Sequence, residues 1–348
     1  MPDDLPKIHR GKRNKPSESN FCQQRLSAWR PLLTARCIYP TFLCIGAAFI
    51  ALGVFLHLAA SRAKEVVVPY TECTTSSKKF ARDELSSHSA ISPVCEYTII
   101  LNEAFKDNVT FYYGLTNFYQ NNRQYIRSRN DVQLFGTIDS TTDCDPFDKH
   151  TVNNISLPIA PCGTVANSMF NDTFAMTYTN ENGTFDVPFS ANNVVQFYEN
   201  RKYKNPPLKN GSLCDAFNGT IKPPDWQKHI CEVGNNDTKY GFENVDFIVW
   251  MNTAPLPDFR KIYRTLNQNQ NSIFAEGLPP GNYTLKINYN YNVVKYKATK
   301  SFIIATTSGS GPKNFFLGIA YMTVGLFLFL LGCGLIVYEC INRKTKYV

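Results

Sequence analysis

Two long runs of apolar residues, one near each end of the chain, dominate the pattern of hydrophobic and polar positions. They cover residues 37–59 and 315–338, and neither run contains an Asp, Glu, Lys or Arg. At a rise of about 1.5 Å per residue, a helix of either length crosses the roughly 30 Å hydrocarbon core of a bilayer. The pattern predicts two membrane-spanning helices, and between them a segment, residues 60–314, that is long enough to form a domain with its own core.

The charges beside the two runs predict the side of the membrane that each segment occupies. Residues 1–36 carry eight basic and three acidic side chains, and residues 339–348 carry three basic and one acidic. Short basic flanks stay in the cytosol, so both tails are expected there and residues 60–314 on the lumenal or extracellular side. The first run starts too far from Met1 for a cleaved signal peptide, so it is expected to remain as a signal anchor. Because the net charge of +8 resides almost wholly on these flanks, it gives no support for nucleic-acid binding.

The segment between the runs has the pattern of a β-rich domain. Residues 282–291 alternate polar and apolar side chains, which is typical of a half-buried strand, and residues 296–306 are expected to pair with them as a hairpin. Further strands are predicted at 66–70, 97–101, 109–115, 174–179 and 246–251, and short helices at 118–129 and 258–266. Several antiparallel strands without a βαβ rhythm favour a mainly antiparallel, sandwich-like domain with short helices.

Six of the eleven cysteines lie in the outer segment, where an oxidising compartment favours disulfides. They are Cys73, Cys95, Cys144, Cys162, Cys214 and Cys231. Six cysteines allow fifteen pairings, and the sequence alone does not choose among them. Pairing in sequence order closes the shortest loops and is the arrangement that we expect. No two of them form a C-x-x-C motif, so a zinc or redox site is not expected.

Eight N-x-S/T sequons predict N-glycosylation of the outer segment. Their asparagines are Asn108, Asn154, Asn171, Asn182, Asn210, Asn218, Asn236 and Asn282. All eight lie between the two apolar runs and none lies in a tail, which supports the predicted topology.

No pattern in the chain is typical of an enzyme. The outer segment has three histidines, His88, His150 and His229, each in a polar, loop-like setting. The sequence has no G-x-S-x-G, phosphate-binding loop, dinucleotide fingerprint, H-E-x-x-H or EF-hand motif. The acidic residues at 143, 145 and 148 are better explained as a solvated turn than as a calcium site. We therefore expect no catalytic residue, no metal and no cofactor.

Two other stretches are candidates for contact with a partner. Residues 21–34 place apolar side chains near helical spacing beside Gln and Arg, so they either dock under a partner's cytosolic surface or lead into the first span. Gly318, Gly325 and Gly332 recur every seven residues in the second run, as Gly46 and Gly53 do in the first. Small residues let helices approach closely in a membrane, so these glycines are expected either to receive a partner's helix or to pack the two spans together.

Several stretches, in order along the chain, resemble one family. They are Gln23–Leu26 with Ala28, Trp29 and Pro31, then Tyr112–Leu115 with Asn117–Asn121, Pro158–Gly163, Ala166–Thr173, Asp246–Met251, Phe259–Lys261, Gly281–Tyr283 and Phe316–Tyr321. Together they resemble the accessory β subunits of type-four P-type ATPases, the phospholipid flippases. The resemblance implies a heterodimer in which the α subunit hydrolyses ATP and moves aminophospholipid from the outer to the cytosolic leaflet. The β subunit supports the folding of its partner, its export from the endoplasmic reticulum and its transport cycle.

The family resemblance also implies roles for individual residues. It implies the pairs Cys144–Cys162 and Cys73–Cys95, with Cys214 and Cys231 remaining, and a glycan on Asn171. The partner-binding residues are then expected to be Gln24, Arg25, Trp29, Gly318, Gly325 and Gly332. The complex is expected in the endoplasmic reticulum, the Golgi and endosomes, and the plasma membrane.

Two other classes of protein share this topology. A subunit of a two-span, trimeric ion channel also has internal termini and a disulfide-rich outer domain, but it needs a polar or narrowing face along a span. A glycosylated surface receptor does not need the motif at residues 23–31. The protein that co-purifies with the chain distinguishes the three classes.

Overall fold

The computed structural model describes residues 19–27, 35–73, 93–106, 108–152, 154–293, 297–306 and 313–345. The chain divides into two compact units, and each is described by itself. The first unit combines Met1–Val54 with Gly318–Val348, and the second is Phe55–Leu317. Residues 28–34, which are part of the segment predicted to dock under a partner or to lead into the first span and which include Trp29, lie outside the described residues.

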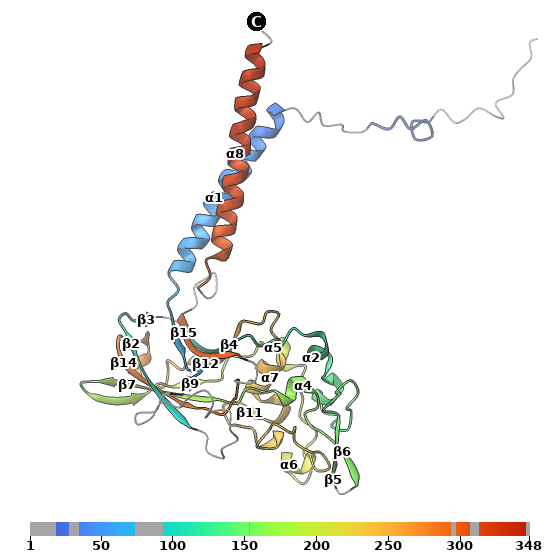
Figure 1. Cartoon of the computed structure of the whole chain (residues 1–348), viewed down its shortest axis with the longest axis vertical. Coiled ribbons are helices and arrows are strands. Elements are labelled where there is room, and N and C mark those ends of the chain that lie inside the picture. The colour runs from blue at the N-terminus through green and yellow to red at the C-terminus, as the bar shows by residue number, and fades with distance from the viewer. Residues whose placement is uncertain are drawn as a thin grey trace, which may run out of the picture. The chain divides into compact units, whose positions relative to one another are not determined.

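Two long helices bear the apolar runs, α1 (Ala35–Ser61) and α8 (Phe316–Thr345), as Figure 1 shows. Within them, Ile38–Ser61 and Phe316–Asn342 are long and apolar enough to cross a membrane. The two helices approach each other through glycine. A Cβ atom built on Gly46 would lie 2.8 Å from the carbonyl oxygen of Gly325, and one on Gly53 would lie 2.9 Å from that of Gly318. Any larger side chain at these points would push the backbones apart.

The second unit contains two antiparallel sheets, which confirms the sandwich-like prediction. One has the strand order β1-β15-β4-β12-β9 and the other β2-β14-β7-β8. In those orders the strands are β1 (Glu65–Pro69), β15 (Thr299–Thr306), β4 (Val109–Thr116), β12 (Phe259–Leu266) and β9 (Phe189–Ser190), and β2 (Val94–Leu101), β14 (Gly281–Asn288), β7 (Thr173–Asn180) and β8 (Gly183–Asp186).

The two sheets meet through aromatic side chains. The ring of Phe174 on β7 lies 4.8 Å from that of Phe302 on β15 and 4.9 Å from that of Tyr263 on β12. On β14, Tyr283, Leu285 and Ile287 are buried while the residues between them are not, as the alternating pattern predicts. Burial of these large rings on both inner faces is the main apolar contribution to the domain.

The predicted hairpin of residues 282–291 and 296–306 is wrong. β14 pairs with β2 and β7, whereas β15 pairs with β1 and β4 in the other sheet. β15 lies between two neighbours and is buried at nearly every position, so it is an internal strand. Proximity in the sequence favoured the hairpin, but burial on both faces placed the strand in the middle of a sheet.

Two further predictions are wrong. Residues 246–251 were predicted as a strand but form a helix, and residues 258–266 were predicted as a helix but form a strand. Helix α7 (Val245–Met251) begins where the side chain of Asn244 accepts a hydrogen bond from the backbone N–H of Phe247. A short apolar run does not distinguish helix from strand by periodicity alone, and this cap decides it. On β12 a bulge between Ile262 and Arg264 shifts the register, so that the buried residues Lys261 and Arg264 are three positions apart, which breaks the alternation of a regular strand.

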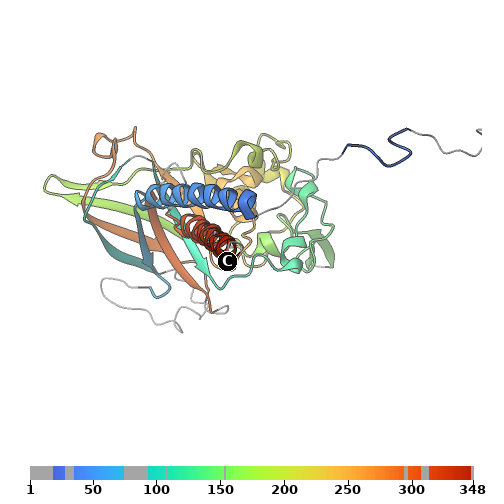
Figure 2. The same cartoon turned by 90° about the horizontal axis from the view of Figure 1, so that it is seen from above.

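Short helices and loops form the rest of the second unit, a helical lobe beside the sandwich (Figure 2). The helices of this lobe are α2 (Arg123–Arg127), α3 (Asp131–Leu134), α4 (Thr164–Asn167), α5 (Phe197–Asn200), α6 (Leu213–Ala216) and α7. Three short strand pairs complete the second unit: β3 (Phe105–Lys106) with β13 (Gly277–Leu278), β5 (Lys149–Val152) with β6 (Ile155–Pro158), and β10 (Gly234–Asn235) with β11 (Lys239–Tyr240).

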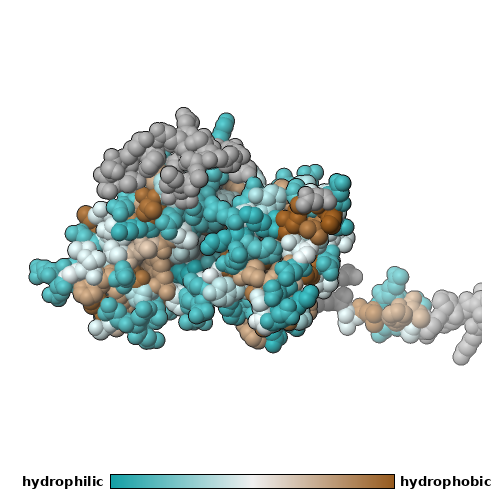
Figure 3. Space-filling view, turned by 90° about the horizontal axis from the view of Figure 1, so that it is seen from below, coloured by the Kyte–Doolittle hydropathy of each residue, from teal (hydrophilic) through white to brown (hydrophobic). Residues whose placement is uncertain are grey.

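The helix predicted at 118–129 is confined to α2, because the side chain of Asn122 caps its first turn. Figure 3 shows a mostly hydrophilic face of the molecule with small hydrophobic patches.

Lys261 on β12 joins the lobe to the sandwich. Its amine donates to the carbonyl oxygens of Val249, Trp250 and Asn252 at the end of α7, at 3.0, 2.8 and 2.8 Å. The last carbonyls of a helix have no partner within it, and a cation also stabilises the negative end of the helix dipole. Burial lowers the pKa of the Lys261 amine well below its usual value.

Replacing Lys261 with Met is therefore expected to lower the free energy of unfolding by about 2 kcal/mol, since it leaves three carbonyls without their charged donor. Thermal unfolding of the full chain in detergent measures the change. The matched control is Lys286→Met, which removes an exposed amine 3.8 Å from Glu96 and should change the stability by less than about 0.5 kcal/mol. Equal effects of the two substitutions would contradict this role of Lys261.

Candidate functional site

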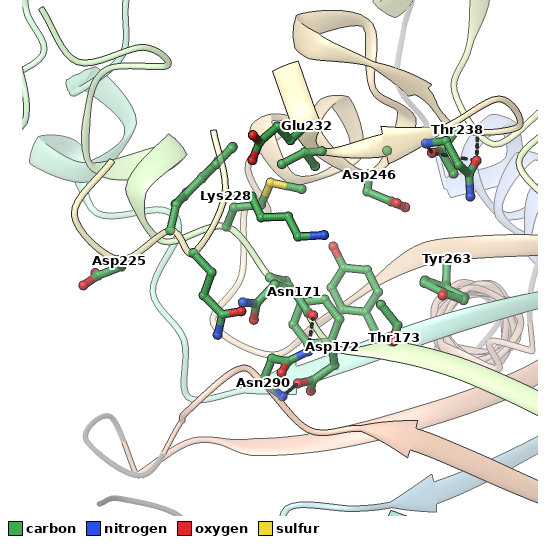
Figure 4. A pocket seen from close by; sticks show the side chains of 18 of the residues that line it. Asn171, Asp172, Thr173, Asp225, Lys228, Glu232, Thr238, Asp246, Tyr263 and Asn290 are labelled. Carbon is green, nitrogen blue, oxygen red and sulfur yellow. Dashed lines mark hydrogen bonds between the residues drawn. The ribbon is translucent and has the colours of Figure 1, made fainter. Parts of the chain in front are cut away.

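A cavity of about 530 Å³ lies between the sandwich and the helical lobe of the second unit (Figure 4). The sandwich contributes Tyr113 from β4 and Tyr263 and Arg264 from β12. The lobe contributes residues 225–228 and 232–235, and the segment 169–173 forms part of the floor. Aromatic rings and polar groups together line this concave surface, which is typical of a binding site for a small ligand.

A fully buried ion pair lies at the base of this cavity. The amine of Lys300 on β15 donates to Asp172 Oδ2 and to the carbonyl oxygen of Tyr291, both at 2.6 Å. Tyr70 also donates its hydroxyl to Asp172 Oδ2, at 3.0 Å. The backbone N–H groups of Asn290 and Tyr291 donate to Asp172 Oδ1 at 2.6 and 2.7 Å. Both oxygens of the carboxylate are therefore satisfied without water.

Burial and the Asp172 carboxylate shift the pKa of the Lys300 amine in opposite directions. Burial lowers the pKa of its amine to about 8, and the charge of Asp172 limits that fall. The same environment raises the pKa of the Tyr70 hydroxyl well above its usual value, first through burial and then through Asp172. At neutral pH the Lys300 amine is thus a cation and the Tyr70 phenol is neutral, so both can donate to Asp172 as these hydrogen bonds require.

A second ion pair forms one wall of the cavity. Arg264 donates from both of its terminal nitrogens to the two oxygens of Asp246 on α7, at 2.5 and 2.9 Å. The two planar groups match in geometry, and such bidentate pairs are the stronger kind. Arg264 and Lys261 thus connect β12 with the first turn and the last turn of α7.

The groups around the cavity do not form a catalytic arrangement. Asp172 is bonded to Lys300 and Tyr70, and Arg264 is bonded to Asp246, so none of these charged groups is paired with a nucleophile. Within the described residues, no group of three His, Cys, Asp or Glu side chains is placed to hold a metal ion, and this applies to the acidic residues at 143, 145 and 148. Burial lowers the pKa of His229, whose ring lies 3.2 Å from the hydroxyl of Thr220. The geometry supports binding or assembly.

The cysteines and sequons of the outer segment are placed consistently with their predicted roles. The six cysteines form the disulfides Cys73–Cys95, Cys144–Cys162 and Cys214–Cys231, the pairing in sequence order. The asparagine of each of the eight sequons is exposed. Every one of them is thus open to the addition of a glycan.

The structure brings together only some of the residues expected to bind a partner. Gln24 and Arg25 belong to a turn in which their N–H groups donate to the carbonyl oxygens of Phe21 and Asn20. The other residues of this prediction are the glycines of α8, Gly318, Gly325 and Gly332, which are buried against α1. Of the two expectations for these glycines, packing of the two spans together is the one that this structure contains.

Reasoning from the sequence missed the cavity and the ion pair beneath it. The one available signal was Lys300, a lone charge beside the apolar residues of β15. Its partner, Asp172, is the middle residue of a sequon and looked like an exposed position. The pair joins residues 128 positions apart, a separation that no local pattern detects.

Comparison with known proteins accounts for nearly the whole chain. The model of the LEM3 (ligand-effect modulator 3) family / CDC50 family matches residues 56–345. The mouse protein "Cell cycle control protein 50A" is 41% identical over 344 residues, which cover 96% of this chain and 91% of the relative. The human "Cell cycle control protein 50B" is 40% identical over 328 residues, 92% of each chain.

A yeast relative has a name that states a role. It is "Phospholipid-transporting ATPase accessory subunit CRF1" of Saccharomyces cerevisiae, 31% identical over 340 residues that cover 90% of this chain and 82% of the relative. The residues that the family model matches include the sandwich, the lobe and α8, and they begin near the end of α1. By the extent of these matches, the chain belongs to the LEM3/CDC50 family.

Proposed function

We propose that this chain is the non-catalytic accessory subunit of a phospholipid-transporting ATPase. The observation that carries the proposal is its match over 90% of its length to the yeast protein named as such a subunit. The two apolar helices and the absence of a catalytic arrangement among the described residues are compatible with this role. ATP hydrolysis and lipid movement then belong to the partner chain, a type-four P-type ATPase in a heterodimer with this one.

The finer features of the role follow from the family resemblance. The accessory subunit supports folding of the ATPase, its export from the endoplasmic reticulum and its transport cycle. The lipid is an aminophospholipid that moves from the outer to the cytosolic leaflet. The complex resides in the endoplasmic reticulum, the Golgi and endosomes, and the plasma membrane, with both tails of this chain in the cytosol.

Affinity purification of the tagged full chain, followed by mass spectrometry, tests the proposal. A P-type ATPase in equal amount, whose ATPase activity responds to phospholipid, is the expected result. A homotrimer without an ATPase would favour the channel subunit instead. Capture of an extracellular ligand in place of an ATPase would favour the receptor.

The cytosolic segment provides a second test. If residues 21–34 dock under the ATPase, replacing Trp29 with Ala should lower the phospholipid-stimulated activity per delivered complex more than it lowers delivery to the cell surface. Surface labelling and activity of the purified complex measure the two quantities separately. Unchanged activity per complex would mean that the segment only leads into the first span.

The glycines of the spans provide a third test. A side chain on Gly325 would meet the backbone of Gly46 and Ile50 at 2.8 Å, so Gly325→Leu is expected to separate α1 from α8 and reduce the amount of folded chain severalfold. Gly334 is the matched control, because a Cβ atom there would meet nothing within 4 Å. Normal folding of Gly325→Leu with loss of the ATPase alone would instead assign this face to the partner.

A further inference from the structure

The hydroxyl group of Tyr113 is a buried polar group without a hydrogen-bond partner among the described residues. Tyr113 lies on β4, is only 4% exposed and lines the cavity between the sandwich and the helical lobe. Its ring stacks on that of Phe170, with 4.0 Å between the ring centres and 1° between the planes. Buried hydroxyl groups are nearly always hydrogen-bonded, so this one is expected to bond to a group that enters the cavity.

The Tyr113 hydroxyl is able to act as a donor to such a group. Burial raises the pKa of this hydroxyl well above its usual value, and the charge of Asp246 raises it further, so the phenol keeps its proton. The stacking on Phe170 holds the ring in place. A ligand that accepts a hydrogen bond from a group held in this way loses little additional freedom on binding.

The charged groups around the cavity pair with one another, with the exception of Lys228. Asp172 is bonded to Lys300, and Asp246 accepts from both terminal nitrogens of Arg264. In the part of the chain that the structure describes, the Lys228 amine forms no hydrogen bond or ion pair. Figure 4 shows this amine directed into the middle of the cavity. The unpaired charge that faces the cavity is therefore positive.

Two further carboxylates, those of Asp225 and Glu232, lie at the edge of the lining. Asp225 accepts a hydrogen bond from the side chain of Asn167 at 2.7 Å, and Figure 4 shows its carboxylate pointing away from the cavity. Glu232 acts electrostatically on the neighbouring ring of His229. Neither carboxylate forms an ion pair with Lys228, so its amine is open to an anion that enters from outside.

The free amine and the free phenol together are suited to an anion. Both groups donate, and a hydrogen bond between charged groups is about twice as strong as one between neutral groups. Met169 and Val233, both half-buried, add apolar lining. The volume of about 530 Å³ is within the range of roughly 300–1,000 Å³ that holds drug-sized molecules, which is more than a bare ion fills. The ligand that fits is an organic anion with an apolar part.

We propose that the cavity between the sandwich and the helical lobe binds a small organic anion, a phosphate or carboxylate on an apolar body, through the Lys228 amine and the Tyr113 hydroxyl. The anion connects the loop of residues 225–235 with β4, so it stabilises the contact between the two parts of the outer domain. The inference goes beyond the role of the chain as an ATPase subunit and does not depend on it, because both groups belong to this chain.

Isothermal titration calorimetry of the purified full chain in detergent tests the proposal, with phenyl phosphate and benzoate as probes. At least one of the two is expected to bind with a dissociation constant below about 1 mM. Phenol has the ring without the anion, and inorganic phosphate has the anion without the ring. Each should bind at least about tenfold more weakly than the better probe. No binding of either probe, or equal affinity for phenol or inorganic phosphate, would overturn the proposal.

Two single substitutions test the contacts themselves. Tyr113→Phe removes only the hydroxyl, and Lys228→Gln removes the charge of an exposed side chain. Each should weaken binding of the better probe about tenfold, the loss typical of one hydrogen bond to a charged group. Lys286→Gln, which removes an exposed amine on β14, is the matched control and should bind like the wild type. Unchanged affinity in Tyr113→Phe or in Lys228→Gln would overturn the site.

Thermal unfolding without a probe distinguishes a role of the Tyr113 hydroxyl in binding from a role in the fold. Because the hydroxyl has no partner within the protein, Tyr113→Phe should leave the melting temperature unchanged or raise it. A lower melting temperature would mean that the hydroxyl is bonded within the folded chain, and it would count against the proposal.

Discussion

The ion pair of Lys300 and Asp172 is the interaction on which the outer domain depends. Both side chains are fully buried, and removing two charges from water costs several kcal/mol for each ion. This cost is offset only where every donor and acceptor has a partner. Asp172 accepts from Lys300, from the Tyr70 hydroxyl and from two backbone N–H groups, and the Lys300 amine also lies 3.2 Å from the centre of the Tyr289 ring.

The position of this pair explains its influence on the rest of the domain. Lys300 belongs to β15 in one sheet, and Asp172 immediately precedes β7 in the other. If the sheets slipped against each other, each charge would be left buried without its partner, at a cost of about 3–5 kcal/mol. The apolar rings between the sheets tolerate many arrangements, but this pair permits one. It therefore also fixes the backbone of Asn171 and the base of the cavity.

Local patterns predicted the strands with one buried face, and failed where the tertiary structure determined the element. β14 alternates along its whole length, and its strand was predictable from residues 282–291 alone. The strand predicted in place of α7 and the helix predicted in place of β12 were wrong because the buried positions of these two elements depend on each other. Lys261 and Arg264 are buried on β12 only because α7 presents carbonyl oxygens and Asp246 to them. The cavity was not predictable, since its lining comes from segments as far apart as Tyr113 and Asn290. Sequons and cysteines, in contrast, are short patterns with a chemical meaning of their own.

Each of the two units is stabilised internally, and the physical cause differs between them. In water, the outer domain gains from burying large rings and then needs charges to select one arrangement. In hydrocarbon, burial gives no such gain, and α1 and α8 associate through the absence of side chains at Gly46, Gly53 and Gly325. If the chain is an ATPase subunit, these glycines are occupied within the chain. A helix of the ATPase would then meet larger side chains on the outer faces of the spans, such as the exposed Phe327 and Leu330. That contact would depend on complementary side-chain packing, which permits affinity to differ among partners more than a close approach of backbones does.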